Sequence, residues 1–175
     1  ELSAKGTIGD DIRLSVDGKD IAVENYLSWI PQGTIPESVE IKRGKIETLS
    51  AVVQRKNDEI SANGRVKIAD GEVAMLGTVI KKIQGLVEMN GKTMNVFLGA
   101  EAEEQRAAVH GKIFLGGDEP RLNLVAESQG FDPSRVMQDI PYQGAVAFSA
   151  DINGTPSNPS VQGEFSVKEG TIYDY

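Results

Sequence analysis

The clearest pattern in this chain is a strict alternation of apolar and polar residues in its second half. Between residues 143 and 153 the apolar residues Val146, Phe148, Ala150 and Ile152 occupy every second position. The residues that alternate with the later members of this series are a serine, an aspartate and an asparagine. Residues 161–167 repeat the alternation with Val161, Gly163, Phe165 and Val167. Because successive side chains of a strand point to opposite faces, both segments predict strands of a sheet with one apolar and one wet face.

The same period continues along the chain, at 109–115, 122–126 and, in the first half, 60–73. Val and Ile together outnumber Leu by 31 to 10, which favours strands over helices. Turn signals fall between the apolar runs at Asp17-Gly18, Asp70-Gly71, Asn90-Gly91 and Gly116-Gly117-Asp118. The sequence therefore predicts an all-β, mainly antiparallel fold of roughly a dozen strands joined by short turns.

The glycines have a regular place in this pattern. Of the 19, eleven are followed two residues later by Val, Ile or Phe: Gly6, Gly33, Gly44, Gly64, Gly71, Gly77, Gly85, Gly111, Gly144, Gly163 and Gly170. Residues two apart in a strand share a face, so a glycine inside a strand would leave a gap among the apolar side chains. The alternative is that most of these glycines end a turn and precede a strand.

Two 20-residue segments, 12–31 and 122–141, align without a gap at an offset of 110. Each consists of a strand, a polar link, an apolar anchor and a short helix that ends at Ile-Pro. In the second copy Asp132 is the expected N-cap, Pro133 the first helical residue, and Phe131 with Val136 a hydrophobic staple. The first copy keeps the apolar stripe of a helix at Val23, Tyr26, Leu27 and Ile30. We interpret residues 1–175 as one β-rich segment of a longer repetitive protein.

Composition and charge narrow the chemistry. The net charge of −8 makes a nucleic-acid-binding surface improbable, and the absence of cysteine removes thiolate catalysis, disulfides and cysteine zinc sites. The single histidine, His110, stands in an alternating strand, without a nucleophile elbow or a phosphate-binding glycine loop elsewhere. Clustered carboxylates such as Glu101, Glu103 and Glu104 fit a solvated face. We predict no catalytic site, no metal site and no cofactor.

The apolar face of such a sheet must be buried against another sheet, against helices or against a ligand. Two short helices cannot cover a dozen strands. The sheet must therefore either fold on itself into a sandwich with a closed core, or curl into an elongated trough that stays open.

The C-terminal stretch 150–172 resembles the signature near the C-terminal part of the TamB family, within the AsmA-like superfamily. The residues that carry the resemblance are Gly154, Thr155, Pro159, Gly163, Gly170 and Ile172. The strand-helix-Ile-Pro unit at 12–31 and 122–141 is similar to elements that recur in that family. Strands marked by Gly-x-Val or Gly-x-Ile, as at Gly64-Arg-Val66, are in the same style. The chain departs from the family pattern in lacking the membrane anchor and the far C-terminal segment.

The resemblance implies a periplasmic segment of an inner-membrane-anchored protein of a diderm bacterium. Such a protein reaches toward an outer-membrane barrel protein, its partner in the translocation and assembly module. The sheet is then bent like a taco, and its apolar lining shields phospholipid acyl chains during transport between the membranes. The family has also been linked to the assembly and secretion of outer-membrane proteins. No catalytic residue is known for it, so none is assigned here.

Three functional hypotheses follow. The first is a non-enzymatic lipid conduit, in which the apolar groove is lined by Ile113, Leu115, Leu122, Leu124, Val146, Phe148, Ile152, Phe165 and Val167. The second is an assembly module that offers a strand edge to a barrel protein through backbone pairing. The third is a right-handed β-helix enzyme acting on acidic polysaccharide, against which the hairpin signals at Asp70-Gly71 and Asn90-Gly91 argue.

Overall fold

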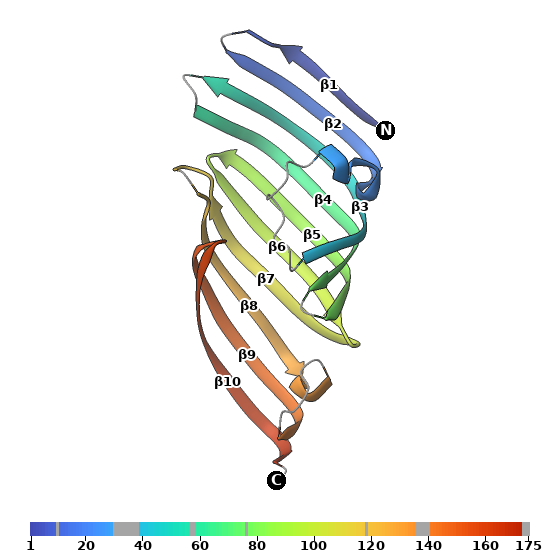
Figure 1. The fold of residues 1–175 in the computed structure, drawn as a ribbon, viewed down its shortest axis with the longest axis vertical. Helices are drawn as coiled ribbons and strands as arrows, with labels where there is room; N and C mark the ends of the chain where they lie inside the picture. Colours follow the sequence, from blue (N-terminus) through green and yellow to red (C-terminus); the bar gives the residue numbers. More distant parts are fainter. Residues whose placement is uncertain are drawn as a thin grey trace.

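The described residues form a single ten-stranded sheet (Figure 1). The structure is a computed structural model, and it describes residues 1–9, 11–29, 39–56, 59–75, 77–117, 119–135 and 141–172. The strands are β1 (Leu2–Thr7), β2 (Ile12–Ala22), β3 (Val39–Lys56), β4 (Glu59–Met75), β5 (Thr78–Gly91), β6 (Thr93–Ala102), β7 (Gln105–Phe114), β8 (Arg121–Phe131), β9 (Tyr142–Thr155) and β10 (Asn158–Ile172).

The topology is a plain antiparallel meander. The order of strands in the sheet is their order in the sequence, and each strand pairs with the strands that precede and follow it. The all-β, antiparallel and elongated fold expected from the sequence is confirmed, with ten described strands in place of roughly twelve. An antiparallel meander is incompatible with the parallel β-helix of the third hypothesis.

The register gathers apolar residues from all ten strands on one face, called the apolar face below, although a few, such as Phe97, lie on the other face. One row across its middle consists of Leu49, Val66, Val87, Val96 and, at β8, Leu124. The positions beside this row face the other way and are mainly polar, such as the paired Arg65 and Glu88, Asn95 and Lys112, and Asn123 and Asn153. The sheet thus has the wet face and the apolar face that the alternation predicts.

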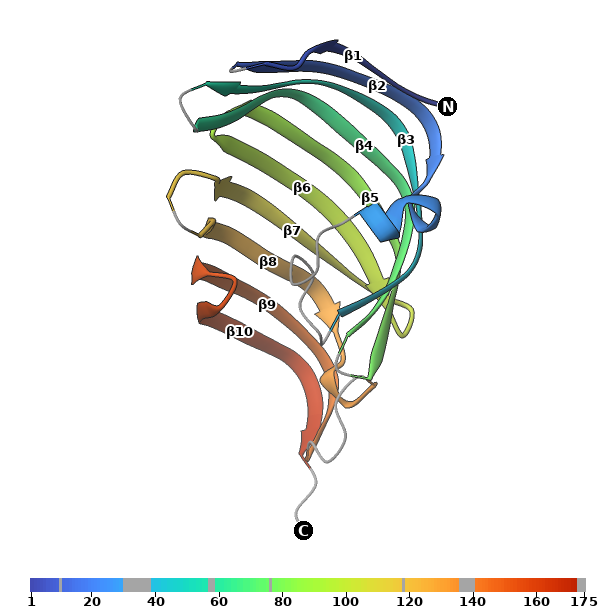
Figure 2. The ribbon, with the colours of Figure 1, turned by 45° about the horizontal axis from the view of Figure 1, so that its top comes forward.

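The apolar face is the concave one. Figure 2 shows every strand bending in the same sense, so that the sheet forms a long half-pipe. Val96, in the middle of the apolar face, is only 5% exposed, whereas its chain neighbour Phe97, on the opposite face, is 52% exposed. Because side chains converge on the inside of a bend and spread on the outside, neighbouring apolar side chains bury one another without a second layer.

Most of the strand glycines lie on this concave face. Nine of the eleven glycines that precede Val, Ile or Phe by two residues lie in strands, and the residues that pair with them lie on the concave face. Of the other two, Gly77 lies in a turn and Gly33 lies outside the described residues. At Gly85 the φ angle is +152°, and a methyl group there would overlap the carbonyl oxygen of Phe97 on β6. The interior-strand interpretation is therefore confirmed, and the turn-ending alternative is wrong.

Two of the predicted turns are wrong because their glycines also lie inside strands. Asp17-Gly18 lies inside β2, where Ile21 and Leu2 fill the space over the glycine. Asp70-Gly71 lies inside β4, with Ile83 over its glycine. The turn predicted at Asn90-Gly91 is confirmed, since both residues end β5 and Asn90 pairs with Thr93 of β6 across it. Gly116-Gly117 lies between β7 and β8, and Asp118 is outside the described residues.

Two short 3-10 helices follow β2 and β8, the strands of the internal repeat. They are η1 (Val23–Trp29) and η2 (Pro133–Arg135), at the two places where the sequence predicts short helices. Asp132 caps η2 as predicted, with its Oδ1 accepting a hydrogen bond from the Ser134 N–H at 3.1 Å. The expected contact partners Val136 and Ile30 lie outside the described residues.

Candidate functional site

The concave apolar face is the main candidate site because nothing described closes it. The accessible surface is 12115 Å², whereas a compact monomer of 18.8 kDa exposes about 8,300 Å². Among the described residues no large side chain is fully buried, and the buried apolar residues are Ile21, Ala51, Ala62, Val96 and Val146. The closed sandwich core considered from the sequence is therefore absent from the described part of the chain.

The structure brings eight of the nine predicted lining residues onto one face of four adjacent strands. Ile113 pairs with Leu122, Leu124 with Ile152, Phe148 with Phe165, and Val146 with Val167 across β7 to β10. The ninth, Leu115, lies one residue beyond β7, where its N–H donates to the carbonyl of Lys92 and its side chain is 39% exposed. Its assignment to a strand was wrong because β7 ends at Phe114.

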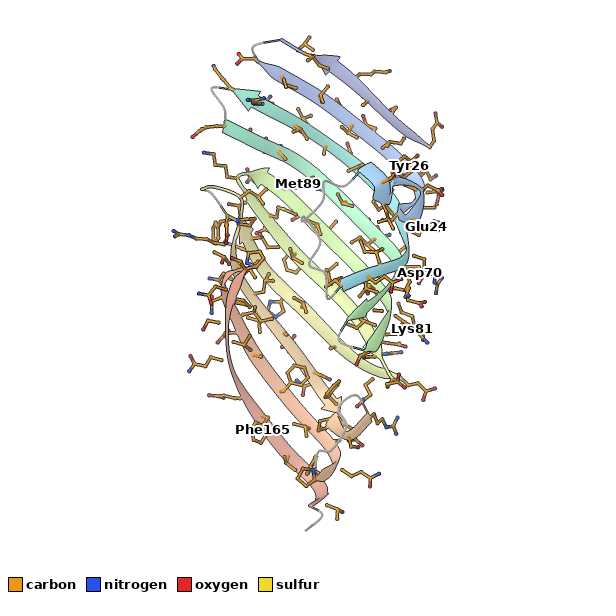
Figure 3. All side chains as sticks on the ribbon, viewed as in Figure 1. Glu24, Tyr26, Asp70, Lys81, Met89 and Phe165 are labelled. Carbon is orange, nitrogen blue, oxygen red and sulfur yellow. The ribbon has the colours of Figure 1, made fainter. Side chains whose placement is uncertain are left out.

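The exposure of these residues rises toward the edge strand. Val146 of β9 is 8% exposed, but its partner Val167 of β10 is 47% exposed, and Phe165 is 77% exposed (Figure 3). Inside the sheet, Phe148 has a neighbouring ring, since it packs edge to face against Phe131 with centroids 5.5 Å apart. The apolar surface therefore continues to the last strand instead of ending before it.

The first half of the sheet also contributes to the face, although none of the predicted lining residues lies there. Val16, Leu49, Val66 and Val87 lie on it, and Met89 pairs with Met94 in its centre. The alternation predicted at 60–73 contains Val66, whereas the period shifts at residues 41–48 of β3 and 81–84 of β5.

Two buried polar side chains on the apolar face have their hydrogen bonds satisfied. The Gln105 side chain pairs with the backbone of Asp132, donating from Nε2 to its carbonyl at 3.0 Å and accepting from its N–H. The Ser128 hydroxyl donates to the Arg106 carbonyl at 2.6 Å. Gln105 thereby ties the segment before η2 to the start of β7, so these groups have a structural role.

At the corresponding end of β3, η1 is tied to the sheet in a similar way. The N–H of Gly44 donates to Oε2 of Glu24 at 3.1 Å, and Val23 covers the apolar side of Gly44. Hydrogen bonds from the Glu24 N–H and from Gly44 hold the pKa of the Glu24 carboxyl below its ordinary value of 4.5. Both helices therefore lie over the same ends of the strands.

Several exposed ion pairs lie on the convex face. The Arg43 guanidinium bonds Asp70 at 2.7 Å and Glu72 at 3.1 Å, and Lys82 bonds Glu101 at 2.6 Å. The bond from Lys82, aided by Arg106, lowers the pKa of Glu101. His110 lies 3.7 Å from Glu127. Within the described ranges, no group of three or more histidine, aspartate or glutamate residues is placed to hold a metal ion.

Comparisons with known proteins give no further guide to the site. A scan against protein-family models, a search of curated proteins and a search of solved structures each found no match to this chain. Among the residues that the structure describes, no helix has the length and apolar character needed to span a bilayer.

Proposed function

We propose that this chain is a non-enzymatic segment of a TamB-like, AsmA-like bridge protein whose concave apolar face shields phospholipid acyl chains in transit between two membranes. The observation that carries the proposal is a single sheet with one apolar face across all ten strands and no second layer over the described strands. In this proposal the chain lies in the periplasm of a diderm bacterium, as part of a protein anchored in the inner membrane. There its apolar face supports outer-membrane biogenesis.

The energetics of the face suit a conduit better than a tight binding site. Burying a methylene yields ~0.8 kcal/mol, so about ten methylenes would contribute ~8 kcal/mol before the cost of ordering the chain. The central rows of the face are aliphatic and carry no charge. A bound acyl chain therefore meets no fixed polar contact there, and can slide along the rows with small changes in energy.

Site-specific photocrosslinking tests the proposal. Benzoylphenylalanine placed at Phe148 or Phe165 of the delipidated chain should crosslink to lipid from phosphatidylglycerol vesicles, detected by mass spectrometry. Matched controls are the chain neighbours Ala147 and Ser166, which pair with each other on the convex face. Crosslinks to protein alone from positions 148 and 165, or equal lipid yields from all four positions, would refute the lipid-shielding role.

The exposed edge of β10 supports a second candidate function, an assembly module for an outer-membrane barrel protein. β10 is 15 residues long, and Val161 is 64% exposed on it. A long edge strand with free backbone groups pairs readily with a strand of another protein. Deleting residues 170–175 should then abolish recovery of the barrel protein in a pull-down while leaving lipid crosslinking at Phe148 intact. Unchanged recovery would contradict this second function.

A further inference from the structure

The turns after β1, β3, β5, β7 and β9 share one rim of the half-pipe, called the turn rim below (Figure 2). The hairpin of β7 and β8 ends there in two adjacent exposed apolar residues, Phe114, which is 40% exposed, and Leu115, together called the β7–β8 tip. Ile8, in the turn after β1, is exposed at the same rim, whereas the described turns of the opposite rim expose no large apolar residue. Adjacent apolar side chains at the tip of a hairpin mark a surface that contacts something other than water.

Two cations flank the β7–β8 tip on the convex face. Arg121, the first residue of β8, pairs with Phe114, and Lys112 precedes Phe114 by two residues on β7, so the three side chains share a face. Both cations are exposed, and neither forms an ion pair with another described residue. The carboxylate of Glu119, in the loop between β7 and β8, accepts a hydrogen bond from the Ser157 hydroxyl at 2.6 Å. The tip therefore combines apolar residues with two cations that have no ion-pair partner among the described residues.

Phe114 lines an open pocket of about 480 Å³. The other described lining residues are Lys92, Thr93, Gly116, Arg121, Leu122 and Asn123. The Lys92 ammonium is paired with Glu59 at 2.8 Å, whereas the Arg121 guanidinium has no carboxylate partner among the described residues. A guanidinium offers two parallel N–H donors to a phosphate, and none of the described lining residues carries a carboxylate that would repel one. The pocket therefore fits the phosphate of a lipid headgroup.

The concave apolar face begins one residue behind the tip. Ile113 and Leu122, two of the predicted lining residues, pair with each other immediately inside the pair of Phe114 and Arg121. One residue of strand is about 3.3 Å long, so a bilayer surface that reaches Phe114 also lies next to the apolar face. Apolar side chains bind a bilayer by entering the boundary between headgroups and acyl chains, and nearby cations add attraction to anionic lipids.

We propose that the β7–β8 tip docks on a lipid bilayer that contains anionic phospholipids. Phe114 and Leu115 enter the headgroup region, while Arg121 and Lys112 contact lipid phosphates. The net charge of −8 opposes an anionic surface, but at physiological salt charges more than about 8 Å apart are largely screened, so the local cations decide. This inference rests on the proposed lipid-shielding function and adds the place at which lipid passes between the bilayer and the apolar face.

Co-sedimentation with vesicles tests the docking. The chain should bind vesicles of phosphatidylcholine with phosphatidylglycerol more tightly than vesicles of phosphatidylcholine alone. Phe114→Ser should lower the partition coefficient about tenfold for both kinds of vesicle, because the inserted ring is lost. Arg121→Gln should lower it about fivefold for the vesicles with phosphatidylglycerol and by less for phosphatidylcholine alone.

The matched control is Phe97→Ser, the same change on the same face. Phe97 is more exposed than Phe114 but lies in the middle of β6, away from the turn rim, so its replacement should leave vesicle binding unchanged. Unchanged binding in Phe114→Ser, an equal loss in Phe97→Ser, or no binding of the intact chain to either kind of vesicle would overturn the docking. Circular dichroism confirms that each variant keeps its sheet.

Crosslinking from position 148 separates the docking from the proposed function. Lipid supplied in vesicles should crosslink to benzoylphenylalanine at this position more slowly in Phe114→Ser than in the intact chain. Soluble dihexanoylphosphatidylglycerol, which needs no bilayer contact, should crosslink equally in both. Equal rates from vesicles would overturn the docking, whereas the absence of a crosslink from either lipid source would refute the lipid-shielding function.

Discussion

Glycine residues on the concave face let neighbouring strands come close where the sheet bends. The ideal Cβ position at Gly85 falls on the backbone of β6, and at Gly111 it falls on the carbonyl of Asn123 in β8. Both residues have φ angles between +130° and +160°, at +152° and +138°, which residues with a side chain rarely adopt. A glycine inside a flat strand would only weaken that strand. We therefore infer that these glycines are present because the curved sheet brings the neighbouring backbone too close for a side chain.

We expect Gly85→Ala to destabilise the fold by about 2–3 kcal/mol, because the methyl group meets backbone and the φ angle is strained. The matched control is Gly99→Ala on β6, where a Cβ would have no neighbour within 4 Å and φ is not positive. This change should stay within about 0.5 kcal/mol. Urea unfolding curves give both values, and equal midpoints for the two variants would contradict the role assigned to Gly85.

At the scale of elements, η1 is attached to the sheet through an ionised carboxylate. In the folded state the pKa of the Glu24 carboxyl lies below its ordinary value of 4.5. The contribution of Glu24 to stability is therefore complete above pH 4.5, and it is lost as the pH falls through the lower folded-state pKa. We therefore expect the Gly44 amide, which donates to Glu24, to lose protection from hydrogen exchange in this acidic window. Exchange rates corrected for intrinsic pH dependence measure the effect.

The matched variant for this prediction is Glu24→Gln, which keeps an acceptor oxygen but cannot ionise. Its Gly44 amide should show protection that is independent of pH over the same window, apart from effects of other carboxyl groups. A wild-type profile that coincides with that of the variant would show that η1 is attached by other contacts.

Most elements could be predicted from the sequence, and the differences from the structure have two causes. In β9 and β10 the alternation runs without interruption over the lining residues, so the faces of Val146 and Phe165 follow directly from period 2. In β3 the register shifts near Lys45 and Thr48 break the period, so the face of the residues before Thr48 does not follow from the regular alternation after it. The Asp-Gly pairs at 17–18 and 70–71 lie inside strands because pairing across long strands outweighs their local turn propensity.

Two features of the proposed sites lie beyond what the alternation contains. Period 2 separates the two faces but does not say which one becomes concave, since the direction of bending depends on close approach between strands, as at Gly85. The place of Arg121 beside Phe114 becomes visible only when the ladder aligns β7 with β8. From the sequence alone, Arg121 reads as an ordinary polar residue at the start of a strand.

At the scale of the whole molecule, the sheet resembles a one-dimensional array. Strong contacts join strands that are neighbours in sequence, and no described second layer connects β2 with β9. In such arrays stability is the sum of local terms and nearest-neighbour terms, so distant parts can unfold separately. The single sheet should therefore depart from two-state unfolding.

Native-state hydrogen exchange on a Val146→Ala variant tests this. Val146 is 8% exposed on β9 between Phe131 and Val167, and losing two buried methyl groups should cost about 2 kcal/mol. We expect amides of β8 to β10 to lose protection by that amount, while those of β2 to β4 keep theirs. Val161→Ala, the same change at a residue 64% exposed, should alter neither group by more than about 0.5 kcal/mol. An equal loss of protection in all strands would mean that the half-pipe unfolds as one cooperative unit, with its bend coupling the two ends.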